Sequence, residues 1–207
     1  MGISMNRTLM TLLVFTSLGL AGRGADSVED ILTRIMTQNG ISELDRYQLQ
    51  NMVRSRAVSY ELERGVAGNA VQYQDFGLLA GVLANKRLQP RDLAPYLHMK
   101  ECNAQCVKML TDYGCSPDNR QEGKVPLHRA ASNEDLAKVI ALLNARANRY
   151  INDEHGNNVA HIAAAECISL KVASEILQHV GHARECKNHR GLTAIDIFLE
   201  RVRENCR

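Results

Sequence analysis

The sequence predicts an all-α solenoid, in which helical repeats stack side by side and are preceded by further helices. The first observation is the nine-residue motif GKVPLHRAA at residues 123–131. A second copy starts at Gly156, 33 residues later, and a third starts at Gly191, after another 35 residues. Self-similarity with a period of this length is typical of repeat proteins, whose units bury their apolar faces against one another.

The motif contains the residue types that a tight turn and a following helix require. Gly123 tolerates the positive φ of a hairpin tip, and Pro126 fits the first position of a helix, where an N–H has no partner within the helix. His128 has two ring nitrogens that can hydrogen-bond backbone groups of a neighbouring turn. Ala130 and Ala131 are small enough for the next helix to approach closely. We therefore expect each copy to begin with a turn that leads into a helix.

The motif resembles the opening signature of an ankyrin repeat, G-x-T-P-L-H-x-A-A, and the 33-residue step is the ankyrin period. The chain departs from this signature in that Val125 and Asn158 stand in place of Thr, Val159 and Ala194 in place of Pro, and Asp196 in place of His. Asp at this last position is common in terminal repeats of the family. The resemblance thus implies that the third copy is a C-terminal cap with a more polar outer face.

The end of the second helix in the family reads L-x-x-x-G-A, and this pattern recurs as well. It matches at Leu110–Cys115, at Leu142–Asn148 with Arg146 in place of Gly, and at Ile176–Gly181. The register predicts a divergent first repeat at 90–119, repeats at 120–152 and 153–187, and a terminal repeat at 188–207. The first repeat has an offset echo of P-L-H at Pro95–His98, and we expect its first helix to be distorted.

Residues 1–25 have the composition of an export signal. Arg7 gives a positive start, Leu9–Leu20 is a mostly apolar run of 12 residues without charge, and Gly19 and Ala21 are small residues suited to cleavage. The run is shorter than the roughly 20 residues that a membrane-spanning helix needs. We expect an exported protein, secreted or periplasmic, with no stable membrane span after cleavage. The alternative is an N-terminal apolar helix that packs on the domain.

Residues 26–89 are predicted to be helical but show no clear repeat. The expected helices are one that starts at the capping box Ser27–Asp30 and stops before Gly40, one that starts at Ser42 and ends near Gly65 with Leu44 and Tyr47 among its apolar residues, and one from Phe76 to before Pro90. We interpret this region as a helical N-terminal cap for the repeats, because an end repeat would otherwise expose an apolar face. Degenerate repeats and a separate functional domain are the alternatives.

The cysteines allow two interpretations. An even number of cysteines in an exported protein suggests disulfides, and this chain has six: Cys102, Cys106, Cys115, Cys167, Cys186 and Cys206. However, Cys115 stands where the family has a packed alanine, and Cys102 and Cys106 lie four residues apart on an expected helix, pointing the same way. Since cysteine commonly behaves as a small buried hydrophobe, we expect mostly free structural thiols. If one bridge forms, the candidate is Cys186 with Cys206.

No residue pattern predicts catalysis, a cofactor or nucleic-acid binding. The net charge is only +2, and Lys and Arg do not cluster with aromatic residues. The chain contains no G-x-S-x-G elbow, P-loop or H-E-x-x-H motif. One run of zinc-competent residue types occurs at His179, His182, Cys186 and His189. The repeat register places this run in a loop, so we expect solvated or capping roles and no metal site.

The resemblance also implies how the protein works, because ankyrin-like proteins usually recognise other proteins through hairpin loop tips and the concave surface of their first helices. The loop-tip residues here are Gln121, Glu122, Lys124, Glu154, His155, Asn157, His189 and Arg190. The concave positions are Arg129, Ser132, Asn133, Ile162, Ala165 and Glu166. We expect these residues to bind a partner protein on a rigid surface, with little ordering cost.

Three functions are consistent with the sequence. The first is an exported adaptor for another protein, for example an effector of a pathogen or symbiont that binds a host protein. The second is a periplasmic or secreted inhibitor, or a protective partner, of an enzyme. The third is an enzyme whose site lies in residues 26–89 or among the cysteines. Because the family consists of binding scaffolds, the first is preferred and catalysis is not expected. The oligomeric state stays open.

Overall fold

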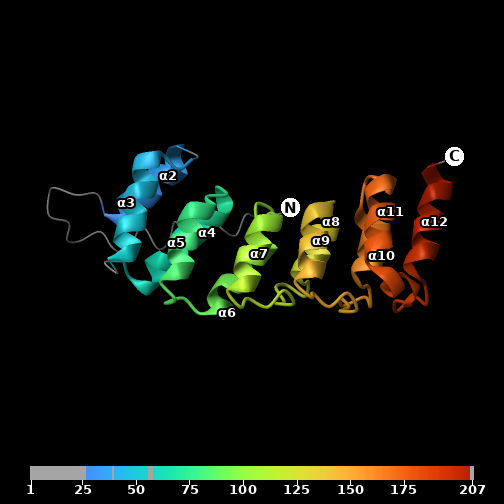
Figure 1. The fold of residues 1–207 in the computed structure, drawn as a ribbon. Helices are drawn as coiled ribbons and strands as arrows, with labels where there is room; N and C mark the ends of the chain where they lie inside the picture. Colours follow the sequence, from blue (N-terminus) through green and yellow to red (C-terminus); the bar gives the residue numbers. More distant parts are fainter. Residues whose placement is uncertain (1–26, 39, 56–57, 206–207) are drawn as a thin grey trace. The chain divides into compact units, whose positions relative to one another are not determined.

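The computed structural model describes residues 27–38, 40–55 and 58–205, and within these residues the chain forms α-helices and two 3₁₀ helices, without strands beyond two isolated bridges. The expected export signal and Cys206 lie outside the described residues. The chain divides between Gln89 and Pro90 into two compact units. The fold class is all-α, as the sequence predicts (Figure 1).

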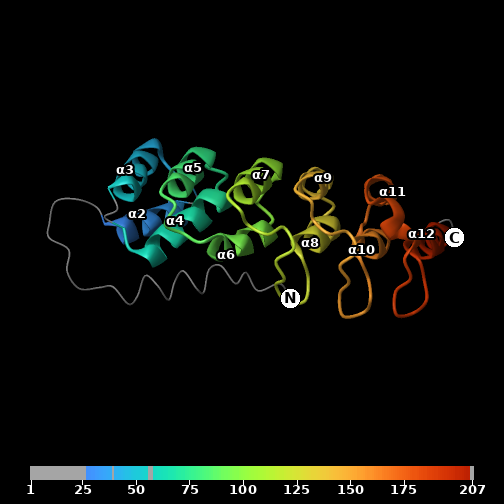
Figure 2. The ribbon, with the colours of Figure 1, turned by 60° about the horizontal axis from the view of Figure 1, so that its bottom comes forward.

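The N-terminal unit consists of two helix pairs. Its helices are α2 (Val28–Gln38), α3 (Glu43–Arg54), α4 (Tyr60–Gln72) and α5 (Phe76–Ala84). Within this unit α2 contacts α4 and α3 contacts α5, so that first helices meet first helices and second helices meet second helices (Figure 2). The unit is therefore stacked in the manner of two successive helix-turn-helix repeats.

The start of α2 follows the prediction, but the next helix does not. The Ser27 Oγ accepts from the N–H of Asp30, and the Asp30 carboxylate accepts from the N–H of Ser27, which is the reciprocal bonding of a capping box. The prediction of a single helix from Ser42 to about Gly65 is wrong. The segment forms two helices, because Ser59 caps a new helix start with an Oγ that accepts from the Leu62 N–H.

The prediction that Leu44 and Tyr47 lie on the apolar face of this helix is also wrong. Leu44 and Tyr47 are 62% and 65% exposed. The buried face of α3 is instead formed by Asp45, Leu49 and Val53. Asp45 is tolerated there because its Oδ1 accepts from Arg34 Nε at 2.9 Å and its backbone N–H and Oδ2 complete the cap with Ser42.

The turn between α4 and α5 has the same construction as the turn between the helices of the second predicted repeat, α8 (Pro126–Ser132) and α9 (Leu136–Asn144). In each turn a non-glycine residue takes a positive φ, 54° at Gln74 and 59° at Glu134. The next residue is an aspartate, Asp75 or Asp135, whose carboxylate caps the following helix. This shared turn favours the degenerate-repeat interpretation of the N-terminal unit.

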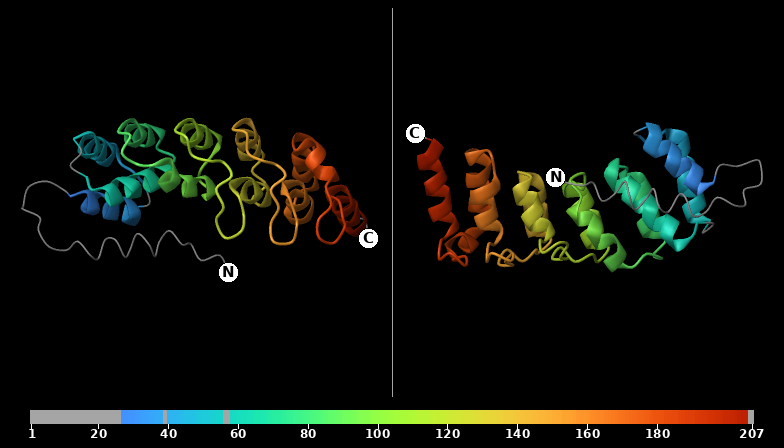
Figure 3. Two further views of the ribbon diagram at one scale, coloured as in Figure 1. Left: turned by 90° about the horizontal axis from the view of Figure 1, so that it is seen from below. Right: turned by 180° about the vertical axis from the view of Figure 1, so that it is seen from behind.

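The second unit continues the helix-turn-helix pattern. Besides α8 and α9 it contains α6 (Pro90–Leu93), the 3₁₀ helix η1 (Ala94–His98), α7 (Ala104–Asp112), α10 (Val159–Glu166), α11 (Leu170–His179), the 3₁₀ helix η2 (Gly181–Glu185) and α12 (Ala194–Asn205). Within this unit α8, α10 and α12 form one layer and α7, α9 and α11 form the other (Figure 3). The first repeat starts with a short helix and a 3₁₀ helix, so its predicted distortion is confirmed.

Long loops leave the second helices and return to the next first helices on the same side of this unit (Figure 3). Their tips turn at Gly123, Gly156 and Gly191, with φ of 76°, 75° and 75°, so the conformation expected at Gly123 is confirmed. We call these three loops the fingers: residues 113–125, 145–158 and 186–193. The second residue after each of α7, α9 and α11 also has a positive φ, at Gly114, Arg146 and Gly181, which confirms that Arg146, at φ 65°, occupies the glycine position of the repeat.

The core of the second unit is a continuous column of aliphatic side chains. Fully buried members include Leu97, Leu110, Leu127, Leu142, Ile162 and Ile176. Alanines on α8 and α10 are buried as well, and their small side chains let the first helices pack closely. This packing fixes the first helices and the bases of the fingers relative to one another within the second unit.

Candidate binding groove

Three buried histidines each connect the first helix of one repeat to the finger that follows it. Their Nε2 atoms donate to backbone carbonyl oxygens in the pairs His98 with Asn119 at 2.8 Å, His128 with Ile151 at 2.9 Å, and His161 with Leu192 at 3.1 Å. The turn-stabilising role expected for His128 is therefore confirmed. His98 has the same role in the divergent repeat, where the offset P-L-H echo is its only sequence signal.

The equivalent position in the last copy is Asp196, and its side chain bonds within its own turn. Its Oδ2 accepts from the backbone N–H and the Oγ1 of Thr193, at 2.9 and 2.7 Å. The Thr193 Oγ1 in turn accepts from the Asp196 N–H at 3.2 Å. The substitution of His by Asp thus replaces a bond to a following finger with a capping box at the start of α12.

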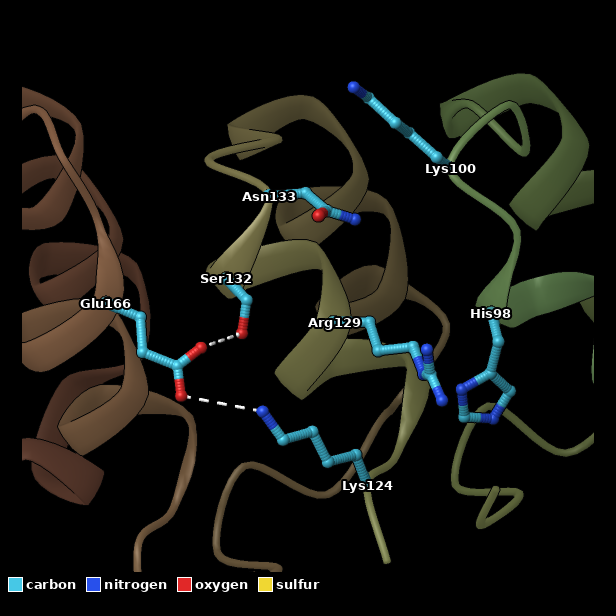
Figure 4. A pocket seen from close by; sticks show the side chains of 7 residues that line it. All are labelled: His98, Lys100, Lys124, Arg129, Ser132, Asn133 and Glu166. Atoms are coloured by element: carbon cyan, nitrogen blue, oxygen red, sulfur yellow. Dashed lines mark hydrogen bonds and ion pairs between the residues drawn. The ribbon is translucent and has the colours of Figure 1, made fainter. Parts of the chain in front are cut away.

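A groove lies where the first repeat, the first finger and the end of α10 come together (Figure 4). Its volume is about 330 Å³. Seven side chains line it: His98, Lys100, Lys124, Arg129, Ser132, Asn133 and Glu166. Five of these residues are on the predicted binding list. The other two, His98 and Lys100, belong to the divergent repeat and were not predicted to bind.

Two ion pairs lie at the groove: one joins residues seven apart in sequence, and the other joins residues 42 apart. Arg129 Nη2 lies 2.7 Å from Glu122 Oε2, and Lys124 Nζ lies 3.5 Å from Glu166 Oε1. Ser132 Oγ donates to the other carboxylate oxygen of Glu166 at 2.5 Å. All four charged side chains are at least 31% exposed, so these pairs are in contact with water. The lining carries Lys100, Lys124, Arg129 and the Glu166 carboxylate, and Glu122 pairs with Arg129 beside it, so these five side chains have a net charge of +1.

His98 forms one wall of the groove as a neutral ring. Burial, with a smaller effect of the nearby Arg129 charge, lowers the pKa of His98 to about 4, although the hydrogen bond to Asn119 acts in the opposite direction. Figure 4 shows the Arg129 guanidinium beside the imidazole. Its Nδ1 has no hydrogen-bond partner among the described residues, and neither does the Arg129 Nε. At neutral pH the positive charges of the groove are therefore those of Lys100, Lys124 and Arg129.

Comparison with known families gives one match. A family model described as ankyrin repeats, in three copies, matches residues 96–188. Residues 96–188 are ankyrin repeats. The second unit is thus an all-α ankyrin-repeat solenoid, and the groove lies where the first finger meets the first helices. No curated protein matches the chain significantly.

Ankyrin repeats are protein–protein interaction modules and are typically not enzymes. The groove contains no pairing of a nucleophile with a general base, because its histidine donates to a backbone carbonyl and its serine bonds Glu166. Among the described residues no helix is long and apolar enough to cross a membrane.

The other predicted site residues lie on the fingers, outside the groove. Glu154 and His155 are exposed at the tip of the second finger, with 3.8 Å between a carboxylate oxygen and Nε2. Asn157 is half-buried, and its Oδ1 accepts from Asn188 Nδ2 at 2.9 Å, which ties the second finger to the third. Gln121 pairs through its backbone with Lys124 across the first tip. His189 and Arg190 are exposed on the third finger.

One concave position of the sequence analysis is corrected by the structure. Ile162 was expected on the binding surface, but it is 2% exposed. The reason is that α10 packs between α8 and α12 and also against α11, so most of its residues are buried. Ala165 and Glu166, at the end of the same helix, are exposed.

The run of zinc-competent residues is dispersed by the ankyrin fold. His179 Nδ1 bonds the Glu175 carbonyl at 2.9 Å, His182 lies 3.3 Å from Glu185, and the His189 ring lies against Gly156. In the part of the chain that the structure describes, no group of three or more His, Cys, Asp or Glu side chains is placed to hold a metal ion.

Proposed function

We propose that the protein is an exported adaptor whose ankyrin repeats bind a partner protein through the charged groove, and that the partner presents acidic side chains. The observation that carries the proposal is the convergence of Lys100, Lys124 and Arg129 on one groove. Carboxylates are the natural partners of such a group, since Arg and Lys both form charge-assisted hydrogen bonds with them.

The carboxylates already present in the groove do not oppose this proposal. Exposed ion pairs such as Arg129 with Glu122 and Lys124 with Glu166 contribute only about 0–1 kcal/mol each. An incoming carboxylate can therefore replace Glu122 or Glu166 at little cost. Helices and short hairpins build the surface, so its side chains lose little freedom when a partner binds.

The proposal of export rests on the sequence of residues 1–25, with the charged Arg7, the apolar run and the small residues near Ala21. Protein recovered outside the cytoplasm is expected to start between residues 22 and 26. An intact N-terminus on protein found only inside the producing cell would contradict export, while leaving the binding proposal in place.

Affinity capture with matched variants tests the binding proposal. The full chain with Lys100→Gln and Lys124→Gln loses two charges from the groove, and the chain with Lys108→Gln and Lys171→Gln loses two from the exposed faces of α7 and α11. We expect a partner held by the wild type and by the α7/α11 variant to be released by the groove variant. All three proteins are first compared by circular dichroism, which excludes misfolding as the cause.

Each other outcome has a definite meaning. A partner lost from both variants binds through net charge alone, and a partner kept by both binds elsewhere; either result contradicts the groove as the site. If the partner is an enzyme whose activity changes in the complex, the protein is an inhibitor or protective partner rather than an adaptor.

A further inference from the structure

Two buried thiols lie unusually close together at the start of α7. Cys102 Sγ and Cys106 Sγ are 2.7 Å apart. Nonbonded carbon atoms pack at about 3.5–4.0 Å, and sulfur is larger than carbon, whereas a disulfide bond is roughly 2.05 Å long. The pair is thus closer than nonbonded packing allows. Both side chains are buried, with 0% and 1% exposure.

The local backbone explains how two residues four apart approach so closely. Within a helix, side chains at i and i+4 have Cβ atoms about 5–6 Å apart, which is wider than the roughly 3.5–4.5 Å of a disulfide. Cys102, however, lies outside the helix. The N-cap is Asn103, whose Oδ1 accepts from the N–H groups of Gln105 and Cys106. Cys102 is therefore free to turn its Sγ toward Cys106.

We propose that Cys102 and Cys106 form an intramolecular disulfide that staples the first turn of α7. The oxidant is a low-molecular-weight disulfide, RSSR. One cysteine thiolate attacks a sulfur of RSSR and releases RS⁻, which takes up the proton that the thiol lost. The second cysteine then attacks the resulting mixed disulfide and releases a second RSH in the same way. The two cysteines lose two electrons in total, and RSSR gains them.

The burial of both thiols indicates when the bond forms. The thiolate is the nucleophile in thiol–disulfide exchange, and the hydrogen bond from Cys102, together with burial, raises the pKa of Cys106 far above its usual range. Exchange in the packed helix is therefore slow. The disulfide forms while α7 is still open, in an oxidising compartment, and burial then protects it from reductants.

The staple would fix the segment that carries one wall of the groove. Cys102 N–H donates to the Met99 carbonyl at 3.2 Å, and the same carbonyl accepts from the buried Lys138 Nζ at 2.6 Å. His98 and Lys100 flank Met99 on either side. The disulfide proposal stands on the thiol geometry; its formation in the cell rests on the proposed export, but not on the proposed binding of a partner.

The sequence provides a direct assay. Trypsin cleaves after Lys100 and Lys108, so both cysteines lie in one peptide, Glu101–Lys108, which contains no other cysteine. The full chain is refolded with a mixture of reduced and oxidised glutathione. It is then denatured in the presence of iodoacetamide, which alkylates free thiols, and digested. We expect this peptide to carry no alkyl group and to weigh two hydrogens less than its reduced form. Two alkyl groups, or a link to any other cysteine, would overturn the proposal.

Variants provide a second readout. Wild type and Cys115→Ser that are refolded in reductant are expected to unfold at a midpoint a few degrees below that of the same proteins refolded with oxidised glutathione. The double variant Cys102→Ser, Cys106→Ser should show no change with reductant. If Cys115→Ser alone abolishes the effect of reductant, Cys115 is in the bridge and the proposed pairing is wrong. If the double variant fails to fold, the mass of the Glu101–Lys108 peptide decides by itself.

Discussion

His98 shows how one side chain links the stability of the repeats to the geometry of the groove. Its Nε2 is used in the bond to Asn119, and its ring forms a wall beside Arg129. The ring is buried next to the Arg129 and Lys138 charges, with Glu122 the opposing carboxylate. A protonated His98 would place a further positive charge among these cations, so the folded protein favours the neutral form.

This environment predicts a pH dependence of stability. The pKa of His98 is about 4 in the folded protein and near 6.5 in the unfolded chain, so between these values the unfolded chain binds more protons. The free energy of unfolding should therefore fall as the pH drops from 6.5 to 4, by on the order of 2 kcal/mol from His98. Urea unfolding at pH 7 and pH 4 measures this change.

The control is His98→Gln, which keeps a neutral donor near the Asn119 carbonyl but does not titrate. Burial also lowers the pKa of His128, and that contribution is present in both proteins, so it cancels in the comparison. The variant should lose less stability on acidification than the wild type. Equal losses in the two proteins would show that His98 is not the neutral buried ring described above.

At the scale of the helices, the residue just before each first helix of the repeats differs in how it caps that helix. Val125 has no side-chain cap, whereas Asn158 forms a capping box with His161, and Thr193 forms one with Asp196. Asn158 makes a further bond, because its Nδ2 donates to the Ala183 carbonyl at 2.8 Å. The residue that departs from the family signature thus connects α10 to η2.

We expect Asn158→Ala to lower the free energy of unfolding by about 2–3 kcal/mol, since it removes a cap and leaves a buried carbonyl without its donor. The matched change is Ser169→Ala at the cap of α11, where the side chain is half-buried and caps only the Val172 N–H. It should cost about 0.5–1 kcal/mol. Thermal or urea unfolding measures both, and equal losses would mean that the Ala183 bond contributes nothing.

The secondary structure was predictable where the chain repeats itself and less so elsewhere. The starts of α8 and α10 follow from the motif, because a glycine turn and a helix-starting residue occur in register. The break between α3 and α4 was missed. Ser59 is a good N-cap, but the apolar spacing across residues 43–65 also fits one long helix, and tertiary packing decides between the two.

At the scale of the whole molecule, the groove combines residues that no local pattern connects. Lys124 and Glu166 lie 42 residues apart in sequence, and His98 lies 31 residues before Arg129. The repeat register predicted that Lys124, Arg129 and Glu166 lie on the binding side. It did not predict His98 and Lys100, because the first repeat is distorted by η1 and its motif is shifted by one residue.

The thiol pair was also only partly predictable from the sequence. The spacing of Cys102 and Cys106 predicted that the two side chains point the same way, and the structure agrees. Their 2.7 Å separation depends on Asn103 being the N-cap, which places Cys102 outside α7. Spacing alone does not distinguish two thiols on one helix face from a pair that is ready to form a bond.

The central claim is that the charged groove of the ankyrin repeats is the surface that recognises a partner. Hydrogen–deuterium exchange of the full chain, alone and with the captured partner, tests it most directly. We predict slower exchange at residues 98–101, 121–125 and 132–134 and at the end of α10, with α7, α9 and α11 unchanged on their outer faces. Protection confined to the helices of the N-terminal unit, or to α7, α9 and α11, would contradict the claim.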